Sequence, residues 1–266
     1  MVKDLELSRR VFSCIDNTTL NGTDNEDSVK EFCLRTMEKK LSPSTSHLSP
    51  FQVAAVCVYP RFVSVARKAL EGSGIKVASV AGAFPHGQLP LHLKVEEVKY
   101  AIGEGADEID MVLSRGALLA GEDNIVRDEV AVLKEACQGR TLKVILETGE
   151  LLTPEVSPFT PHLSPLWRAS QLAIDGGADF IKTSTGKIGI GATLEAAEIM
   201  LNVINENVKK SKKTVGFKAA GGISTPEEAL AYAELAKKIL GDNYISNQTF
   251  RIGASRLTDR LFAILT

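Results

Sequence analysis

Short runs of apolar and β-branched residues recur along the chain, and each run is bounded by glycine, proline or polar residues. Runs of this kind are typical of buried β-strands. Segments with apolar residues at helical spacing lie between most of them, for example over residues 193–210. The pattern predicts eight strands, over residues 14–20, 53–59, 76–84, 108–113, 142–148, 180–185, 215–220 and 250–255.

The stretch "STPEE" marks the start of another helix, which we predict over residues 226–239. Thr225 can cap this helix, Pro226 suits its first turn, and Glu228 completes a capping box. Strands that alternate with helices indicate parallel βαβ units.

Eight such units in a chain of 266 residues have the size of a (β/α)8 TIM barrel. A doubly wound open sheet is the alternative, but no G-x-G-x-x-G follows the first predicted strand. We therefore predict one α/β domain over residues 1–266, a single (β/α)8 barrel. Ser/Pro-rich loop insertions are expected near residues 39–51 and 152–165.

Two segments of the chain echo one another. "AIGEGADEID" at 101–110 and "AIDGGADFIK" at 173–182 share A-I-x-x-G-A-D-x-I in register, so that Asp110 and Lys182 take the same position in strands four and six. Alternate strands of a barrel fill the same interior layers. The two side chains are therefore expected to face one another, even if the shared G-A-D is only a common helix-to-strand turn.

Two lysines lie within predicted buried strands, Lys182 in "GADFIKTSTGK" and Lys218 in "VGFKAAGG". An isolated buried ammonium is costly, and two neighbouring ones should lower each other's pKa. A neutral lysine can attack a carbonyl and form a Schiff base, and Asp110 can supply acid–base help. The alternative is a stem that reaches solvent or an ordinary salt bridge. For Lys143 we expect an ion pair with Glu147 on the same strand face.

Glycine-rich stretches follow the last three predicted strands: "STGKIG", "AAGGIST" and "RIGAS". Loops after the last strands of a barrel often hold a phosphate, because glycine lets backbone N–H groups converge on an anion. The alternative role of these glycines is only to turn the chain at strand ends. The candidate phosphate residues are Gly186, Lys187, Gly221, Gly222, Gly253 and Ser255.

Three further candidates for substrate contact lie at or near the ends of the first two predicted strands: Asp16, Thr18 and Cys57. Asp16 can accept a hydrogen bond from a substrate hydroxyl, or form a turn with its own backbone. Cys57 has no identifiable base beside it, and a small core residue is the commoner role for a cysteine.

Composition narrows the class of protein. A formal net charge of −2 gives no electrostatic case for nucleic acid or an anionic membrane, and no apolar run approaches the roughly 18 residues of a membrane span. The four cysteines show no CxxC spacing and the four histidines no HxxxH pair, so neither disulfides nor a metal site is expected. The charged N-terminal segment favours a cytoplasmic location.

The chain resembles the deoxyribose-phosphate aldolase family of the bacterial–eukaryotic type. The stretches that carry the resemblance span nearly the whole chain in order: "IDNTTLN", "AAVCVYPRF", "FPHG", "GADEID", "LKVILETGEL", "GADFIKTSTGK", "VGFKAAGG" and "FRIGAS". The resemblance implies cleavage of 2-deoxy-D-ribose 5-phosphate to D-glyceraldehyde 3-phosphate and acetaldehyde, with no cofactor and no metal. It implies that Lys182 forms the Schiff base, that Asp110 and Lys218 move protons, and that the protein is a homodimer.

Three positions depart from the family pattern. Ala219 stands where a proline is frequent, Ser224 where an arginine is common, and Arg256 where a second serine is common. Arg256 is expected to restore the positive charge that Ser224 lacks. A Schiff-base aldolase for another phosphorylated sugar and a non-catalytic barrel that binds a protein partner are the alternative functions.

Overall fold

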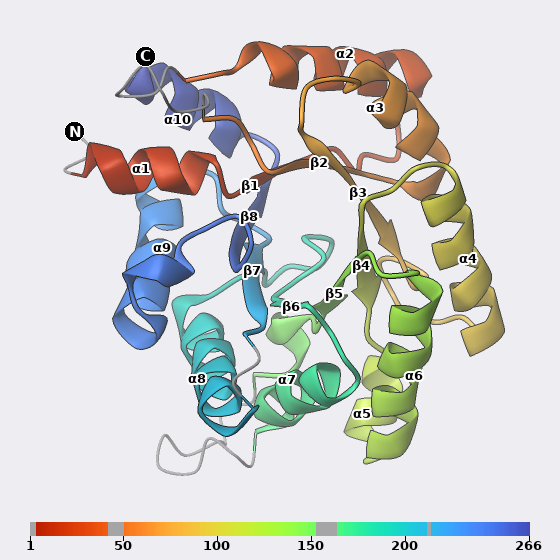
Figure 1. Ribbon diagram of the computed structural model, residues 1–266. Helices are drawn as coiled ribbons and strands as arrows, with labels where there is room; N and C mark the ends of the chain where they lie inside the picture. Colours follow the sequence, from red (N-terminus) through yellow and green to blue (C-terminus); the bar gives the residue numbers. More distant parts are fainter. Residues whose placement is uncertain (1–3, 42–50, 153–163, 212–213) are drawn as a thin grey trace.

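The computed structural model describes residues 4–41, 51–152, 164–211 and 214–266. Eight parallel strands follow one another in sequence order around a closed barrel, in which β1 also pairs with β8 (Figure 1). The predicted (β/α)8 barrel is confirmed, and the open sheet is excluded. The strands are β1 (Ile15–Thr18), β2 (Ala55–Val58), β3 (Lys76–Ala81), β4 (Glu108–Val112), β5 (Thr141–Ile145), β6 (Phe180–Lys182), β7 (Gly216–Ala220) and β8 (Phe250–Ala254).

The helices surround the barrel (Figure 1). The two outermost in sequence, α1 and α10, pack against each other. The α-helices are α1 (Leu5–Phe12), α2 (Glu26–Glu38), α3 (Val63–Ala69), α4 (Leu91–Gly103), α5 (Arg115–Leu119), α6 (Asp123–Ala136), α7 (Pro165–Asp175), α8 (Leu194–Ser211), α9 (Pro226–Leu240) and α10 (Leu257–Leu265). Short 3-10 turns are η1 (Pro60–Phe62), η2 (Thr148–Glu150) and η4 (Asp242–Tyr244). Most of the two predicted insertions, residues 42–50 and 153–163, lies outside the described residues.

The predicted capping box at the start of α9 is confirmed. Thr225 Oγ1 accepts a hydrogen bond from the Glu228 N–H at 3.2 Å, and Glu228 Oε2 accepts one from the Thr225 N–H at 2.9 Å. Two donors at the helix start, which have no partner within the helix, are satisfied in this way. The box fixes the point at which the chain leaves the loop after β7.

Several strands are shorter than predicted, and β6 shows why. The prediction ran to residue 185, but the strand ends at Lys182. Beyond it, Thr183 Oγ1 accepts from the Ala220 N–H at 2.9 Å and donates to the Ala220 carbonyl at 2.8 Å. A side chain thus replaces the backbone ladder to β7, which frees the following residues to form a loop.

Alternation along each strand separates two environments. In β4, Ile109 and Met111 join the apolar core between barrel and helices, whereas Glu108 and Asp110 make ion pairs inside the barrel. Such a period of two is the geometry of any strand. Inside the barrel a second, small apolar cluster covers one wall, made by Leu20, Ala55, Cys57, Ala78 and Val80. One wall of the interior is therefore apolar, and charged side chains gather on the other strands.

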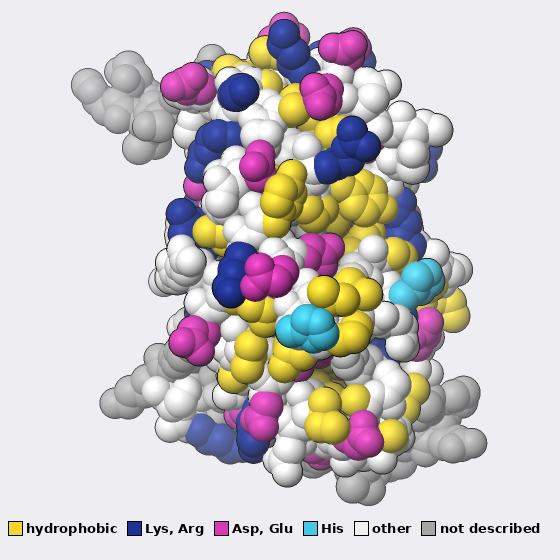
Figure 2. Space-filling model, turned by 90° about the vertical axis from the view of Figure 1, so that its right-hand side faces the viewer, with side chains coloured by type: hydrophobic (Ala, Val, Ile, Leu, Met, Phe, Trp, Pro, Cys, Tyr) yellow, Lys and Arg dark blue, Asp and Glu magenta, His cyan; other side chains and the backbone are white. Residues whose placement is uncertain are grey.

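Several large apolar side chains are exposed on α4. This helix lies on the right of Figure 1, and Figure 2 shows that side of the molecule, where apolar side chains gather among charged ones. Leu91, Leu93 and Tyr100 of α4 are 38%, 44% and 50% exposed. A surface of this kind often contacts another protein chain.

Close packing inside the barrel leaves no room at Gly216. An added Cβ would lie 2.2 Å from the ring of Phe180, which is itself 4% exposed. We predict that Gly216→Ala lowers the free energy of unfolding by about 1–3 kcal/mol, because the ring must leave its position. A fall in the midpoint of thermal unfolding measures the effect. Gly22→Ala is the control, since a Cβ there meets open space; equal midpoints for the two variants would contradict the prediction.

Candidate active site

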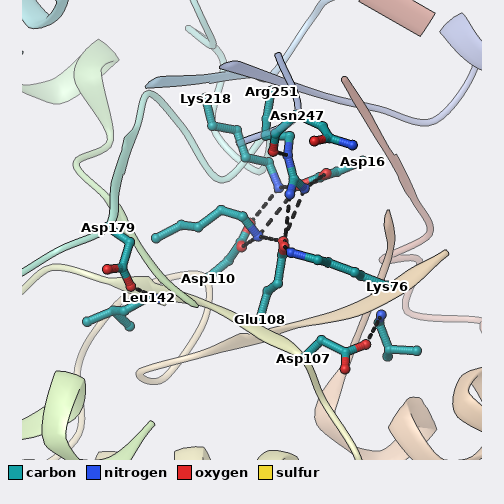
Figure 3. Close-up of polar contacts among 12 residues, drawn as sticks. Asp16, Lys76, Asp107, Glu108, Asp110, Leu142, Asp179, Lys218, Asn247 and Arg251 are labelled. Carbon is teal, nitrogen blue, oxygen red and sulfur yellow. Dashed lines mark hydrogen bonds and ion pairs between the residues drawn. The ribbon is translucent and has the colours of Figure 1, made fainter. Parts of the chain in front are cut away.

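Charged side chains from six strands converge on the middle of the barrel. Figure 3 shows part of this cluster, including Asp16, Glu108, Asp110, Lys218 and Arg251. None is more than 3% exposed, although water is the preferred surrounding of every one of them. They alternate along their strands with apolar residues that face the helices. These residues are Asp16 of β1, Glu108 and Asp110 of β4, Lys143 of β5, Lys182 of β6, Lys218 of β7 and Arg251 of β8.

Asp110 is the centre of this cluster. Its Oδ2 lies 2.7 Å from both Lys182 Nζ and Lys218 Nζ, and its Oδ1 lies 2.8 Å from Lys143 Nζ. Lys182 and Lys218 are paired neighbours in the register of β6 and β7, so both point toward β4 from the same side. The expected facing of Asp110 and Lys182 is confirmed.

A second layer of ion pairs lies beside this centre. Asp16 contacts Lys218 Nζ at 2.5 Å and Arg251 Nη1 at 2.6 Å, through different carboxylate oxygens. Glu108 contacts Arg251 Nη2 at 2.8 Å and Lys143 Nζ at 2.6 Å. All of these groups are therefore paired, which is what allows charges to be buried.

The expected ion pair between Lys143 and Glu147 is wrong. Lys143 binds Asp110 and Glu108 instead. The chain leaves the barrel wall at Glu147, whose φ of 61° is left-handed, and its carboxylate accepts hydrogen bonds from Thr185. A residue that has left the strand no longer shares a face with one four positions earlier.

The pKa values of the two central lysines move in opposite directions. Burial lowers the pKa of Lys182; the Asp110 carboxylate opposes this shift and the Lys218 ammonium adds to it. Burial acts in the same sense on Lys218, but the carboxylates of Asp110 and Asp16 raise its pKa above the ordinary lysine value. The predicted lowering therefore holds for Lys182 and is wrong for Lys218, because Lys218 contacts two carboxylates and Lys182 contacts one.

The carboxylates remain ionised. Burial would raise the pKa of Asp110, but the ammonium groups of Lys143, Lys182 and Lys218 hold it well below its usual range. Burial is likewise outweighed at Glu108, where Lys143 and Arg251 lower the pKa to about 2.

Charge balance favours a neutral amine at Lys182. The buried cluster has three carboxylates against four basic side chains, so one proton too many is present if every base is charged. The pKa values of Lys143, Lys218 and Arg251 are all raised, and only that of Lys182 is lowered. A fifth base, Lys76, touches Glu108, but its side chain is 40% exposed and water screens its charge.

A cavity of about 270 Å³ opens at the carboxyl ends of β6, β7 and β8. Of the charged cluster described above, Lys182 alone lines it. Its walls include seven residues that the sequence predicted to contact substrate: Thr18, Gly186, Lys187, Gly221, Gly222, Gly253 and Ser255. The cavity thus joins one reactive amine to the glycine-rich loops.

Backbone donors point to an anion site in these loops. Within the described residues, the N–H groups of Gly222, Ile223 and Ser255 have no hydrogen-bond acceptor in the protein. Helix α10 begins just after Ser255, and a helix N-terminus attracts negative charge. Lys187 also lines the cavity, and its ammonium donates to the Leu20 carbonyl. Together these groups form a cationic, donor-rich end of the cavity.

Two predicted substrate contacts lie elsewhere. Asp16 does not line the cavity, and both of its carboxylate oxygens bind basic side chains. Cys57 is fully buried in the apolar cluster inside the barrel, where burial raises the pKa of its thiol. The structure therefore places Asp16 beside Lys218 and Arg251, away from the cavity, and Cys57 in the barrel wall.

Sequence reasoning missed several residues of the site. Glu108 and Arg251 complete the charged cluster, and each is a charged residue two positions from a predicted site residue on the same strand, which was the available signal. Asn21, Thr185 and Ile223 line the cavity without having been predicted. Ser224 and Arg256, the two departures from the family pattern, line this cavity together.

Residues 10–256 match the DeoC/LacD family of aldolases. The chain belongs to this family. A Caenorhabditis elegans protein that is provisionally named a deoxyribose-phosphate aldolase is 44% identical over 253 residues, which cover 94% of this chain and 79% of that protein.

Solved structures agree with the assignment to the DeoC/LacD family. One provisionally named deoxyribose-phosphate aldolase, from Coccidioides immitis, is 27% identical with a TM-score of 0.75, over 95% of this chain and 85% of the other. QR15, described as an aldolase, is 28% identical with a TM-score of 0.73, over 100% and 97% of the two chains.

Neither a metal site nor a membrane-spanning helix is found among the residues that the structure describes. No group of three or more His, Cys, Asp or Glu side chains among them is placed to hold a metal ion. No described helix is long and apolar enough to cross a membrane.

The charge balance of the cluster can be tested at Lys143. In Lys143→Met, three carboxylates face two permanent cations, so we expect the pKa of Lys182 to rise by at least about one unit. Lys182 is reactive above its pKa, and its reactivity will therefore be lost at a higher pH than in the wild type. The rate of reductive methylation of Lys182, followed by mass spectrometry across pH, gives this midpoint.

Lys76→Met is the matched control, because Lys76 also contacts Glu108 but from the exposed end of the barrel. Its midpoint should stay at the wild-type pH. An unshifted midpoint in Lys143→Met, in a variant with wild-type circular dichroism, would refute the charge-balance argument.

Proposed function

We propose that this aldolase cleaves 2-deoxy-D-ribose 5-phosphate to D-glyceraldehyde 3-phosphate and acetaldehyde, through a Schiff base on Lys182. The observation that carries the proposal is the position of Lys182. It joins a buried charge cluster that favours a neutral amine to a cavity with a donor-rich end. In a phosphorylated aldehyde, the carbonyl group suits the Lys182 amine and the phosphate suits the donor-rich end of the cavity.

The first stage forms the covalent intermediate. The neutral amine of Lys182 attacks the C1 aldehyde of the open-chain sugar and, after proton transfer and loss of water, gives a protonated imine. Lys218 keeps its proton because its pKa is raised, so it can donate one to the departing hydroxide. Asp110 touches both lysines and can pass protons between them or to a bound water.

The second stage breaks the bond between C2 and C3. The C3 hydroxyl gives its proton to a base, C3 becomes the aldehyde of glyceraldehyde 3-phosphate, and the electron pair of the broken bond moves through C2 to the iminium nitrogen. The resulting enamine is protonated at C2, and water then releases acetaldehyde from Lys182. Asp110, through a water, is our candidate for the base.

The phosphate is proposed to bind at the loops after β6, β7 and β8. Free N–H groups, the start of α10 and the Lys187 ammonium support this placement. Arg256 lies in the same cavity wall as Ser224, which supports the idea that its guanidinium supplies the charge that an arginine at position 224 would bring.

Two alternatives remain to be separated by assay. An aldolase for a different phosphorylated sugar would prefer another acceptor when a panel of aldehydes is offered with acetaldehyde. A non-catalytic scaffold would release no glyceraldehyde 3-phosphate in a coupled assay. The exposure of Lys182 to the cavity favours catalysis, since a protein-binding scaffold does not need an amine there.

A homodimer and a cytoplasmic location stay predictions. The exposed apolar side chains of α4 support contact between two chains. Light scattering coupled to size-exclusion chromatography would give the mass of the particle in solution.

Trapping tests the role of Lys182 directly. With acetaldehyde and sodium borohydride, we expect the wild-type protein to gain one ethyl group on Lys182 and to lose activity, because reduction makes the imine permanent. The Lys182→Ala variant should gain no ethyl group within the barrel. Lys187→Ala, which changes a lysine at the cavity wall, should be trapped like the wild type. Undiminished trapping in Lys182→Ala would show that the assignment is wrong.

Lys218 is expected to act on the chemistry rather than on binding. In Lys218→Leu, kcat should fall by about 100-fold or more, since a positioned proton donor is lost. The pKa of Lys182 should rise as well, because a neighbouring ammonium no longer lowers it. The acid limb of the pH–rate profile should then move to higher pH. A profile identical to that of the wild type would remove Lys218 from pKa tuning.

A further inference from the structure

A buried carboxylate outside the charged cluster lies behind the donor-rich end of the cavity. Glu147 follows β5, is fully buried, and has φ 61° and ψ 64°. Residues other than glycine seldom adopt this left-handed conformation, and where they do the surroundings hold them in it. The proposed chemistry makes no use of Glu147.

Both carboxylate oxygens of Glu147 are directed at one residue of the neighbouring loop. Oε1 accepts from the Thr185 N–H at 3.2 Å, and Oε2 accepts from Thr185 Oγ1 at 2.5 Å. Thr185 Oγ1 accepts in turn from the Lys187 N–H at 3.1 Å. Glu147 thereby fixes the loop of Thr185, Gly186 and Lys187, which lines the cavity.

The rest of the loop after β5 packs against the same neighbour. The Thr148 N–H donates to the Thr183 carbonyl at 2.9 Å. Gly149 lies so close that an added Cβ would be 2.4 Å from the Ile190 carbonyl oxygen. The loop after β5 therefore supports the loop after β6 along its length, with Glu147 as the charged contact.

Arg115 completes the arrangement from the start of α5. Its Nε lies 2.6 Å from Glu150 Oε2, and its Nη1 lies 3.9 Å from Glu147 Oε2. Arg115 thus shares its charge between two carboxylates, of which only Glu147 reaches Thr185.

We propose that Glu147 is a positioning residue for the phosphate end of the cavity, and that it sets the preference of the enzyme for phosphorylated over unphosphorylated sugars. Glu147 does not touch the cavity itself; it acts by holding Thr185, and through Thr185 the backbone of Gly186 and Lys187. The inference rests on the proposed function for the identity of the sugar. It does not need that function for the binding of the anion.

Glu147→Gln is the sharpest test, because glutamine keeps the shape of the side chain. It offers one acceptor oxygen where the carboxylate offers two, so one of the two Thr185 donors loses its partner. Glu150→Gln is the matched control: it changes the other carboxylate at Arg115 in the same way and leaves the Thr185 contacts in place.

Three measurements are made on the full chain of both variants and the wild type. Calorimetry gives the Kd of inorganic phosphate, steady-state kinetics give KM and kcat for 2-deoxyribose 5-phosphate and for 2-deoxyribose, and borohydride trapping with acetaldehyde reports the amine. In Glu147→Gln we expect phosphate Kd and the KM of the phosphorylated sugar to rise about tenfold. The kcat/KM for 2-deoxyribose and the trapping rate should stay at the wild-type values, and Glu150→Gln should resemble the wild type throughout.

Equal losses for both sugars, or an unchanged phosphate Kd in a folded Glu147→Gln protein, would overturn the proposal. If this variant does not fold, Thr185→Val and Thr185→Ser replace it: the first removes the hydroxyl that links Glu147 to Lys187, and the second keeps it. Phosphate binding should weaken in the valine variant and be restored in the serine variant; equal Kd values for the two would refute the proposal. A wild-type protein that binds phosphate but cleaves no 2-deoxyribose 5-phosphate would disprove the proposed function and leave the phosphate comparison valid.

Discussion

The Asp110 carboxylate contacts the Nζ atoms of three lysines at once, and the arrangement of the barrel interior follows from these contacts. A single buried carboxylate could not balance three lysines if all of them were protonated. Asp16 and Glu108 supply two more negative charges, and Arg251 bridges them. Because the surroundings are dry, each of these interactions is far stronger than on a surface, and a missing partner would be costly. Lys182, the base with the fewest carboxylate contacts, is the one whose pKa is lowered.

The strands and the loops at their carboxyl ends contribute different groups to the site. The strands hold the charged groups, whose positions are fixed by the register of a closed sheet. The loops beyond them hold glycines, backbone donors and the basic side chains Lys187 and Arg256, which together suit an anion. The strands thus set the pKa of an amine, and the loops form the wall of the cavity. Buried hydrogen bonds from the loop after β5 hold the loop after β6 in place.

Sequence was sufficient for the barrel and for the capping box at Thr225, since both depend on spacing within strands and helices. It was also sufficient for the facing of Asp110 and Lys182, since alternate strands of a barrel fill the same interior layers. It failed where a partner comes from a distant strand. Lys218 binds Asp16 across 202 positions of sequence, and Asp110 and Asp16 together reverse the expected direction of its pKa shift. The pairing of Lys143 with Glu147 assumed a straight strand, whereas the backbone turns into a left-handed conformation at Glu147. The alternation of residues along a strand predicts that a charged side chain faces the barrel interior. Its ion-pair partner can be identified only from the closed barrel.

Closure between β1 and β8 has a consequence for the newly made protein. Asp16 enters the chain near its beginning, but its partners Lys218 and Arg251 are added only after most of the barrel has been synthesised. Until those strands join, Lys182 has water around it and keeps its proton like any exposed lysine. The lowered pKa of Lys182 therefore depends on the closed ring of strands.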